Sequence, residues 1–159
     1  DALKNDRRFE IVFHGDGPEL DLYKEYCYVN GFNNIVFTGA YDNANKASLL
    51  QDAQILNNCY GYIKGAGNKL KYAVSNRFYD GMIYRIPQLV EPEGYKSDWA
   101  RQSGIGINLG LDENFADRLY DYYETIDEER FNLSCDNTLK DVLLEDDEYI
   151  SRIDDFIKS

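Results

Sequence analysis

The sequence predicts an α/β fold in which a parallel sheet is covered by helices on both faces, giving three layers. Short apolar runs typical of buried strands alternate with segments whose apolar residues recur at helical spacing, and further helical segments follow at the C-terminus. Strands and helices that alternate at this length require right-handed crossovers between parallel strands. With 159 residues, the chain is long enough for one domain with an ample core.

The first third of the chain contains two strand–helix units. Its β-branched and aromatic runs predict the strands, its glycine turns end them, and Asn30-Gly31 ends the first helix. The predicted elements are a strand at 9–13, a glycine turn at 14–18, a helix that begins near Leu20 and ends at Asn30-Gly31, a strand at 35–39 and a helix at 45–53.

The rest of the chain continues the alternation and then becomes helical. The predicted elements are a weak strand at 53–56, an aperiodic loop at 60–71, a helix at 76–85, a strand at 88–91, a helix around 97–102, a strand at 105–109 and C-terminal helices with apolar stripes at 115–126 and 149–156. The acidic run 145–148 is interpreted as favourable charge at the start of the last helix rather than as a metal site. Residues 1–5 resemble the last turn of a helix, so we expect the chain to be a fragment.

Composition excludes several classes of protein. The 17 basic and 29 acidic residues give a net charge of −12, which argues against binding to the phosphate backbone of nucleic acids. No stretch approaches the roughly 20 apolar residues that span a bilayer, and the N-terminus lacks the apolar core of a secretory signal. The three cysteines are far apart and form no CxxC pair, so we expect reduced thiols in a cytoplasmic protein, without a zinc site or a disulfide.

The most informative segment is 75–82, where a polar loop turns into an amphipathic helix that leads into the strand of residues 88–91. If Ser75 or Asn76 caps this helix, its first-turn N–H groups can hold a pyrophosphate, and Arg77 adds a formal charge. Asp80 lies one turn further on the same face as Asn76, where it can accept hydrogen bonds from ribose hydroxyls. The alternative is an ordinary N-cap at Asn76 and an exposed carboxylate at Asp80.

The same helix also has a predicted inner face. Phe78, Tyr79, Met82, Ile83 and Ile86 are expected to point inward. The glycine at position 81 is expected to let the helix approach a neighbour closely, although it costs about 1 kcal/mol of helix propensity relative to alanine.

A second group of candidate residues follows the strand at 35–39. Gly39, Ala40 and Tyr41 form a candidate wall for a nucleobase, with main-chain groups reading its edge and Tyr41 stacking on it; a plain strand-ending turn is the alternative. His14, the only histidine, comes at the end of the first strand. It either faces the same crevice or serves as a structural histidine.

Four stretches in this order resemble the C-terminal, donor-binding half of GT-B type glycosyltransferases, which are built from two Rossmann-like domains. Among these the chain resembles the bacterial enzymes of capsular and surface polysaccharide synthesis. The stretches are residues 11–18, 35–39, 76–80 with 87–90, and 104–106. The resemblance implies that residues 1–159 form one Rossmann-like domain that binds a nucleoside diphosphate sugar, that Gly15 contributes to donor binding, and that Asp80 contacts the ribose.

Two positions depart from the family pattern. The first of two acidic residues common in the family falls on Tyr72, and the glycine pair after the next strand is replaced by residues 91–93, Glu-Pro-Glu. The resemblance places the acceptor site and the catalytic base on an N-terminal domain that this chain lacks. We therefore expect the chain to bind a donor without turnover and without a metal or cofactor, as part of a cytoplasmic enzyme that associates peripherally with the inner face of the membrane.

An alternative from another class stays open. The same pattern of elements fits a non-catalytic α/β binding or regulatory module of flavodoxin-like shape. That interpretation predicts no nucleotide at the helix that begins near Asn76, and a protein partner on the tyrosine-rich C-terminal helices.

Overall fold

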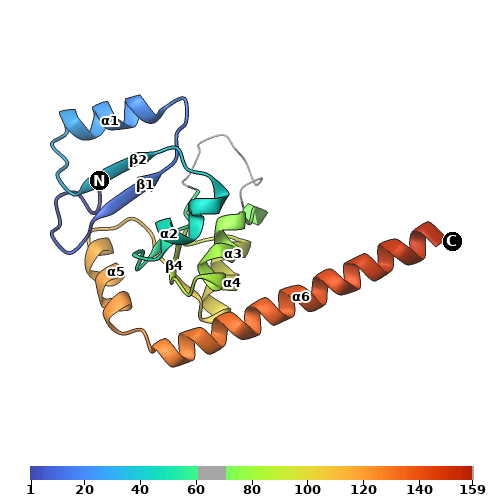
Figure 1. Ribbon diagram of the computed structural model, residues 1–159. Helices are drawn as coiled ribbons and strands as arrows, with labels where there is room; N and C mark the ends of the chain where they lie inside the picture. The colour runs from blue at the N-terminus through green and yellow to red at the C-terminus, as the bar shows by residue number, and fades with distance from the viewer. Residues whose placement is uncertain (61–70, 159) are drawn as a thin grey trace. The chain divides into compact units, whose positions relative to one another are not determined.

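The computed structural model describes residues 1–60 and 71–158, which form an α/β structure with two small parallel sheets (Figure 1). The chain divides into two compact units. The first unit comprises Asp1–Ala53 and Leu111–Tyr120, and the second comprises Gln54–Gly110 and Asp121–Ser159. The α/β class and the parallel pairing are confirmed, whereas one three-layer sheet that combines all the strands stays a prediction.

The first unit contains both predicted strand–helix pairs. Its elements are β1 (Ile11–His14), α1 (Leu20–Val29), β2 (Ile35–Gly39), a 3₁₀ turn at Asn43–Asn45, α2 (Lys46–Leu50) and the first part of α5 (Phe115–Glu124). β1 and β2 pair in parallel with Ile11 opposite Ile35. α1 ends as predicted at Asn30, and Gly31 follows with the positive φ of +65° that favours glycine.

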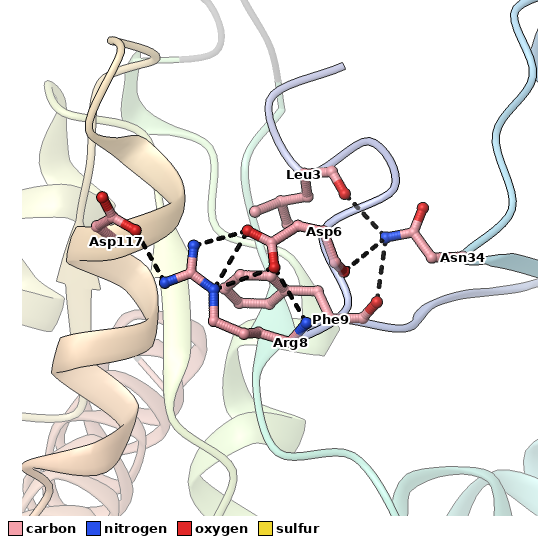
Figure 2. Close-up of polar contacts among 6 residues, drawn as sticks. All are labelled: Leu3, Asp6, Arg8, Phe9, Asn34 and Asp117. Atoms are coloured by element: carbon pink, nitrogen blue, oxygen red, sulfur yellow. Dashed lines mark hydrogen bonds and ion pairs between the residues drawn. The ribbon is translucent and has the colours of Figure 1, made fainter.

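A polar network fixes the segment that precedes β1 (Figure 2). The Asn34 side-chain amide lies 2.8 to 3.3 Å from the carbonyl oxygens of Leu3, Asp6 and Phe9, to which it donates. Arg8 forms ion pairs with Asp6 at 2.6 Å and with Asp117 of α5 at 2.8 Å. Hydrogen bonds from Arg8 lower the pKa of Asp6 to about 2. Residues 2–5 form a hydrogen-bonded turn in which the Lys4 N–H donates to the Asp1 carbonyl at 2.9 Å, and their being the last turn of a helix stays a prediction.

The second unit holds a sheet with the strand order β3-β4-β5. All of its strand pairs are parallel, with Leu56, Gln88 and Gly106 side by side. Its elements are β3 (Leu56–Asn57), α3 (Asn76–Ile83), β4 (Gln88–Val90), α4 (Tyr95–Ser103), β5 (Gly106–Asn108) and α6 (Glu128–Lys158). The predicted element types hold, although each strand is shorter than predicted. The predicted loop at 60–71 lies almost wholly outside the described residues.

The core of the second unit joins α3, α4, α6 and the central strand β4. It consists of the buried residues Phe78, Met82, Val90, Ala100, Ile105, Phe131 and Cys135. Trp99 packs against it with its ring centroid 5.0 Å from that of Phe78. Burial of Phe78, Met82 and Ile86 confirms the predicted inner face of α3, but Ile83 is 56% exposed. Its position follows from the helix, because residue 83 is rotated by about 100° from Met82.

Gly81 allows the close approach that the sequence predicts. A Cβ atom on this glycine would lie 2.6 Å from Cδ of Gln88. α3 therefore packs directly onto the side chain of the first residue of β4.

α6 is one continuous helix of 31 residues. The prediction that residues 145–148 mark a helix start is wrong, because they lie in the interior of α6. Neither glycine nor proline interrupts residues 128–158, and the acidic first turn of α6 is supplied by Glu128 and Glu129. Within the two described ranges, no helix has both the length and the apolar character needed to cross a membrane.

Candidate functional site at the start of α3

The candidate site lies at the carboxyl edge of the sheet in the second unit. β3 ends at Asn57 and β4 at Val90, and the chain that follows these strands leads to the starts of α3 and α4. In parallel α/β sheets this edge is where ligands usually bind, because helix N-termini and strand-end loops meet there. Polar side chains from all of these segments converge at this point.

Asn58 is the centre of the polar cluster and is fully buried. Its N–H donates to the Leu89 carbonyl at 2.8 Å, and its side-chain Nδ2 donates to Oε1 of Gln88 at 2.6 Å. Its Oδ1 accepts from Nε of Arg77 at 3.2 Å and from Oγ of Ser75 at 3.4 Å. One side-chain amide, in the residue after β3, therefore ties the first residue of β4 to the start of α3.

Lys96 places a second charge inside the cluster and is only 1% exposed. Its Nζ donates to the Asn58 carbonyl and lies 3.7 Å from the centre of the Tyr60 ring. Oε2 of Glu91 lies 3.1 Å away as an ion-pair partner without hydrogen-bond geometry. A buried ammonium is tolerated only when it is compensated, and here a carboxylate, a carbonyl and an aromatic face compensate it.

Cys59 borders the same cluster as a half-buried thiol. Burial, followed by the nearby charge of Glu91, raises its pKa to about 11. The thiol is therefore protonated at neutral pH.

The start of α3 is the candidate anion site, and one of its first-turn amides is already used, because the Phe78 N–H donates to the Ser75 carbonyl at 2.9 Å. Ser75 occupies the N-cap position with extended backbone, but its hydroxyl bonds Asn58 instead of capping its own helix. Asn76 and Arg77 are exposed, and the helix start carries a partial positive charge. A guanidinium has five N–H donors, of which the bond to Asn58 uses one. The cluster therefore holds the Arg77 guanidinium by one hydrogen bond at the start of α3.

The sequence-predicted residues of this unit come together in α3. Ser75, Asn76 and Arg77 form its start, and Asp80 follows one turn later, half-buried and four residues from Asn76. This spacing puts the side chains of Asn76 and Asp80 on one face, about 6 Å apart.

The predicted residues of the first unit meet one another at the carboxyl ends of β1 and β2. The Gly15 N–H donates to the Gly39 carbonyl at 2.7 Å, and Ala40 and Tyr41 continue directly from β2. The rings of His14 and Tyr41 lie 6.5 Å apart, edge to face. These residues belong to a different unit from α3.

His14 makes a side-chain hydrogen bond at the end of β1. Its Nδ1 lies 2.8 Å from Oγ1 of Thr38. This contact fits the structural interpretation of the histidine.

Sequence reasoning missed the members of the buried cluster. Asn58, Lys96 and Tyr60 gave no motif, since each is an isolated residue in the sequence. One signal was present: Gln88 is a polar residue inside an apolar strand, and it is fully buried. A polar residue at such a position needs a partner, and that partner is Asn58.

Comparisons of the whole chain with protein-family models, with curated proteins and with solved structures found no match. A function for this chain is therefore inferred from the geometry at α3 and from the sequence resemblance. The two overlap at residues 76–80 and 87–90, whereas the resemblance extends from residue 11 to residue 106.

Proposed function

We propose that the chain is the donor-binding part of a GT-B type glycosyltransferase of bacterial surface polysaccharide synthesis, with its strands combined in one Rossmann-like, three-layer domain. It would bind a nucleoside diphosphate sugar, from which the sugar passes to a glycan or a lipid-linked acceptor. One observation carries the proposal: buried Asn58 fixes the guanidinium of Arg77 at the start of α3.

The diphosphate would bind at the first turn of α3. The chain carries a net charge of −12, so an anion needs a local positive field to approach it. The helix start and Arg77 supply this field, whereas the charge of Lys96 is balanced by Glu91. Because Arg77 is tethered by Asn58, little side-chain freedom is lost when the anion binds.

The nucleoside would be recognised beyond the phosphates. Asp80, one turn along α3, is placed to accept hydrogen bonds from the ribose hydroxyls. Gly39, Ala40 and Tyr41 remain the sequence-based candidates for the nucleobase, and Gly15 remains a candidate for donor binding. The contact between Asn58 and Arg77, which supports the donor site, lies within the second unit.

The chemical step follows from the charge that the site would stabilise. The bond between the anomeric carbon and the diphosphate oxygen breaks, and its electron pair leaves with the diphosphate. An acceptor hydroxyl oxygen forms the new bond, and its proton goes to a base on the acceptor domain. Donors that are already oriented stabilise the leaving group as its charge develops. The complete enzyme would act at the cytoplasmic face of the membrane.

Calorimetric titration with uridine, guanosine and adenosine diphosphates tests the proposal. We expect one diphosphate to bind and its parent nucleoside to bind at least about tenfold more weakly. Arg77→Ala should cost about tenfold in affinity, whereas Arg101→Ala, an exposed arginine in the last turn of α4, should have no effect. Wild-type affinity in an Arg77→Ala, Asp80→Ala double variant would refute the proposal.

A further inference from the structure

The second half of α6 is a surface helix. The buried residues of α6 are Phe131, Cys135 and Thr138, all in its first half, which packs against α3 and α4. Residues 140–158 are all described, and none of them is buried. These five turns of helix therefore contribute little to the core of the second unit.

One face of this half-helix is apolar. We name it the α6 stripe, and it consists of Leu143, Tyr149, Ile150, Ile153 and Ile157. Their spacing of three, four and seven residues places them on one side of the helix. Leu143, Tyr149 and Ile157 are each more than 60% exposed. An exposed apolar patch of this kind marks an interaction surface.

Asp146 lies in the middle of the α6 stripe. It follows Leu143 by three residues and precedes Ile150 by four and Ile153 by seven, so it shares their face. Burial of a carboxylate against an apolar surface is costly unless a cation pairs with it. An apolar partner alone would therefore be disfavoured at the centre of this surface.

The rest of the half-helix is acidic. Residues 140–158 contain three basic and seven acidic residues, a net charge of −4. Two of the basic residues are engaged within the helix, Arg152 with Glu148 and Lys158 with Asp154. The negative field of this segment therefore selects for a positively charged partner.

We propose that the α6 stripe is the docking surface for a basic amphipathic helix of a partner protein, with apolar residues against the stripe and an Arg or Lys opposite Asp146. A second copy of the chain fits poorly, because two such helices would repel each other and a parallel pair would oppose Asp146 to itself. An anionic membrane surface is repelled for the same reason. This inference is independent of the donor site.

Two synthetic helical peptides with identical apolar faces test the proposal. One carries lysines on its flanks and an arginine at the position opposite Asp146, and the other carries glutamates at all of these positions. Binding to the full 159-residue chain is measured by fluorescence anisotropy at two salt concentrations. We expect the basic peptide to bind at least about tenfold more tightly than the acidic one, with the difference shrinking at high salt.

Matched charge reversals locate the contact. Asp146→Lys should weaken the basic peptide about tenfold, whereas Asp155→Lys, the same charge change on the opposite face, should change its affinity less than about threefold. Ile153→Asp should abolish binding while circular dichroism shows an unchanged helix. Equal binding of both peptides, or binding of neither, overturns the proposal. Self-association of the chain, or its binding to anionic vesicles, would also overturn the proposal if Ile153→Asp removes it, because the α6 stripe would then have a different occupant.

Discussion

The two units of this chain use the same element, a pair of parallel strands joined through a helix, but they bury it to different extents. Val12, Phe13 and Val36 on β1 and β2 are each more than 40% exposed, whereas every residue of β4 is buried. The buried strand also carries Gln88 and lies next to Asn58 and Lys96. Burial in the second unit is therefore deep enough to hold polar groups in fixed positions, and the candidate site lies there.

The first unit is organised by surface polar contacts instead. Arg8 and Asn34 hold the segment before β1 through ion pairs and hydrogen bonds. Each such contact is worth little on an exposed surface. We therefore expect stability to respond more strongly to changes in the second unit than in the first.

The largest difference in stability between the two units is expected when an aromatic side chain of each is truncated to alanine. Phe78→Ala removes a fully buried ring and should lower the free energy of unfolding by about 3–5 kcal/mol. Phe13→Ala removes a ring that is 48% exposed and should cost about 1 kcal/mol. Urea denaturation followed by the fluorescence of Trp99, the single tryptophan, measures the first, and circular dichroism measures the second. Equal losses would contradict the comparison.

The next largest loss of stability is expected from breaking the buried ion pair between Lys96 and Glu91. Lys96→Met leaves Glu91 without its cation partner and should destabilise the second unit by about 3 kcal/mol. The double variant Lys96→Met, Glu91→Gln should recover most of this loss in the same denaturation experiment. If the double variant is as unstable as the single one, the lysine contributes through packing and not through charge.

A smaller effect is expected from adding a methyl group where α3 meets β4. Gly81→Ala places a Cβ atom against Gln88 and should cost about 1–3 kcal/mol. Gly17→Ala is the matched control, since a Cβ there meets nothing within 4 Å. If both variants melt at the wild-type temperature, α3 and the Gln88 side chain are not closely packed.

The smallest effect is a pH dependence in the first unit. The pKa of Asp6 is about 2 in the folded chain, below its ordinary value of 3.8. Its contribution to stability is therefore present above pH 3.8 and is lost as the pH falls through 2. Asp6→Asn should remove this part of the acid dependence, measured as the difference between the two unfolding curves. Identical acid profiles would show that the Arg8 contact does not form.

Residue periodicity predicted the fold class, the element types and the start of α3 at Asn76, because these depend on local spacing. The close approach at Gly81 was also predicted. The cluster of Asn58, Gln88 and Lys96 could not be predicted, since it joins residues up to 38 positions apart through tertiary contacts. The continuity of α6 was missed because its acidic residues 145–148 fit a helix start as well as a helix interior.

The most direct test of the account follows the backbone amides of α3 by nuclear magnetic resonance during titration with a nucleoside diphosphate. We expect the amide signals of Asn76 and Arg77 to shift most, and the parent nucleoside to leave them unchanged. Saturating diphosphate that leaves these two signals in place would contradict the assignment of an anion site to the start of α3.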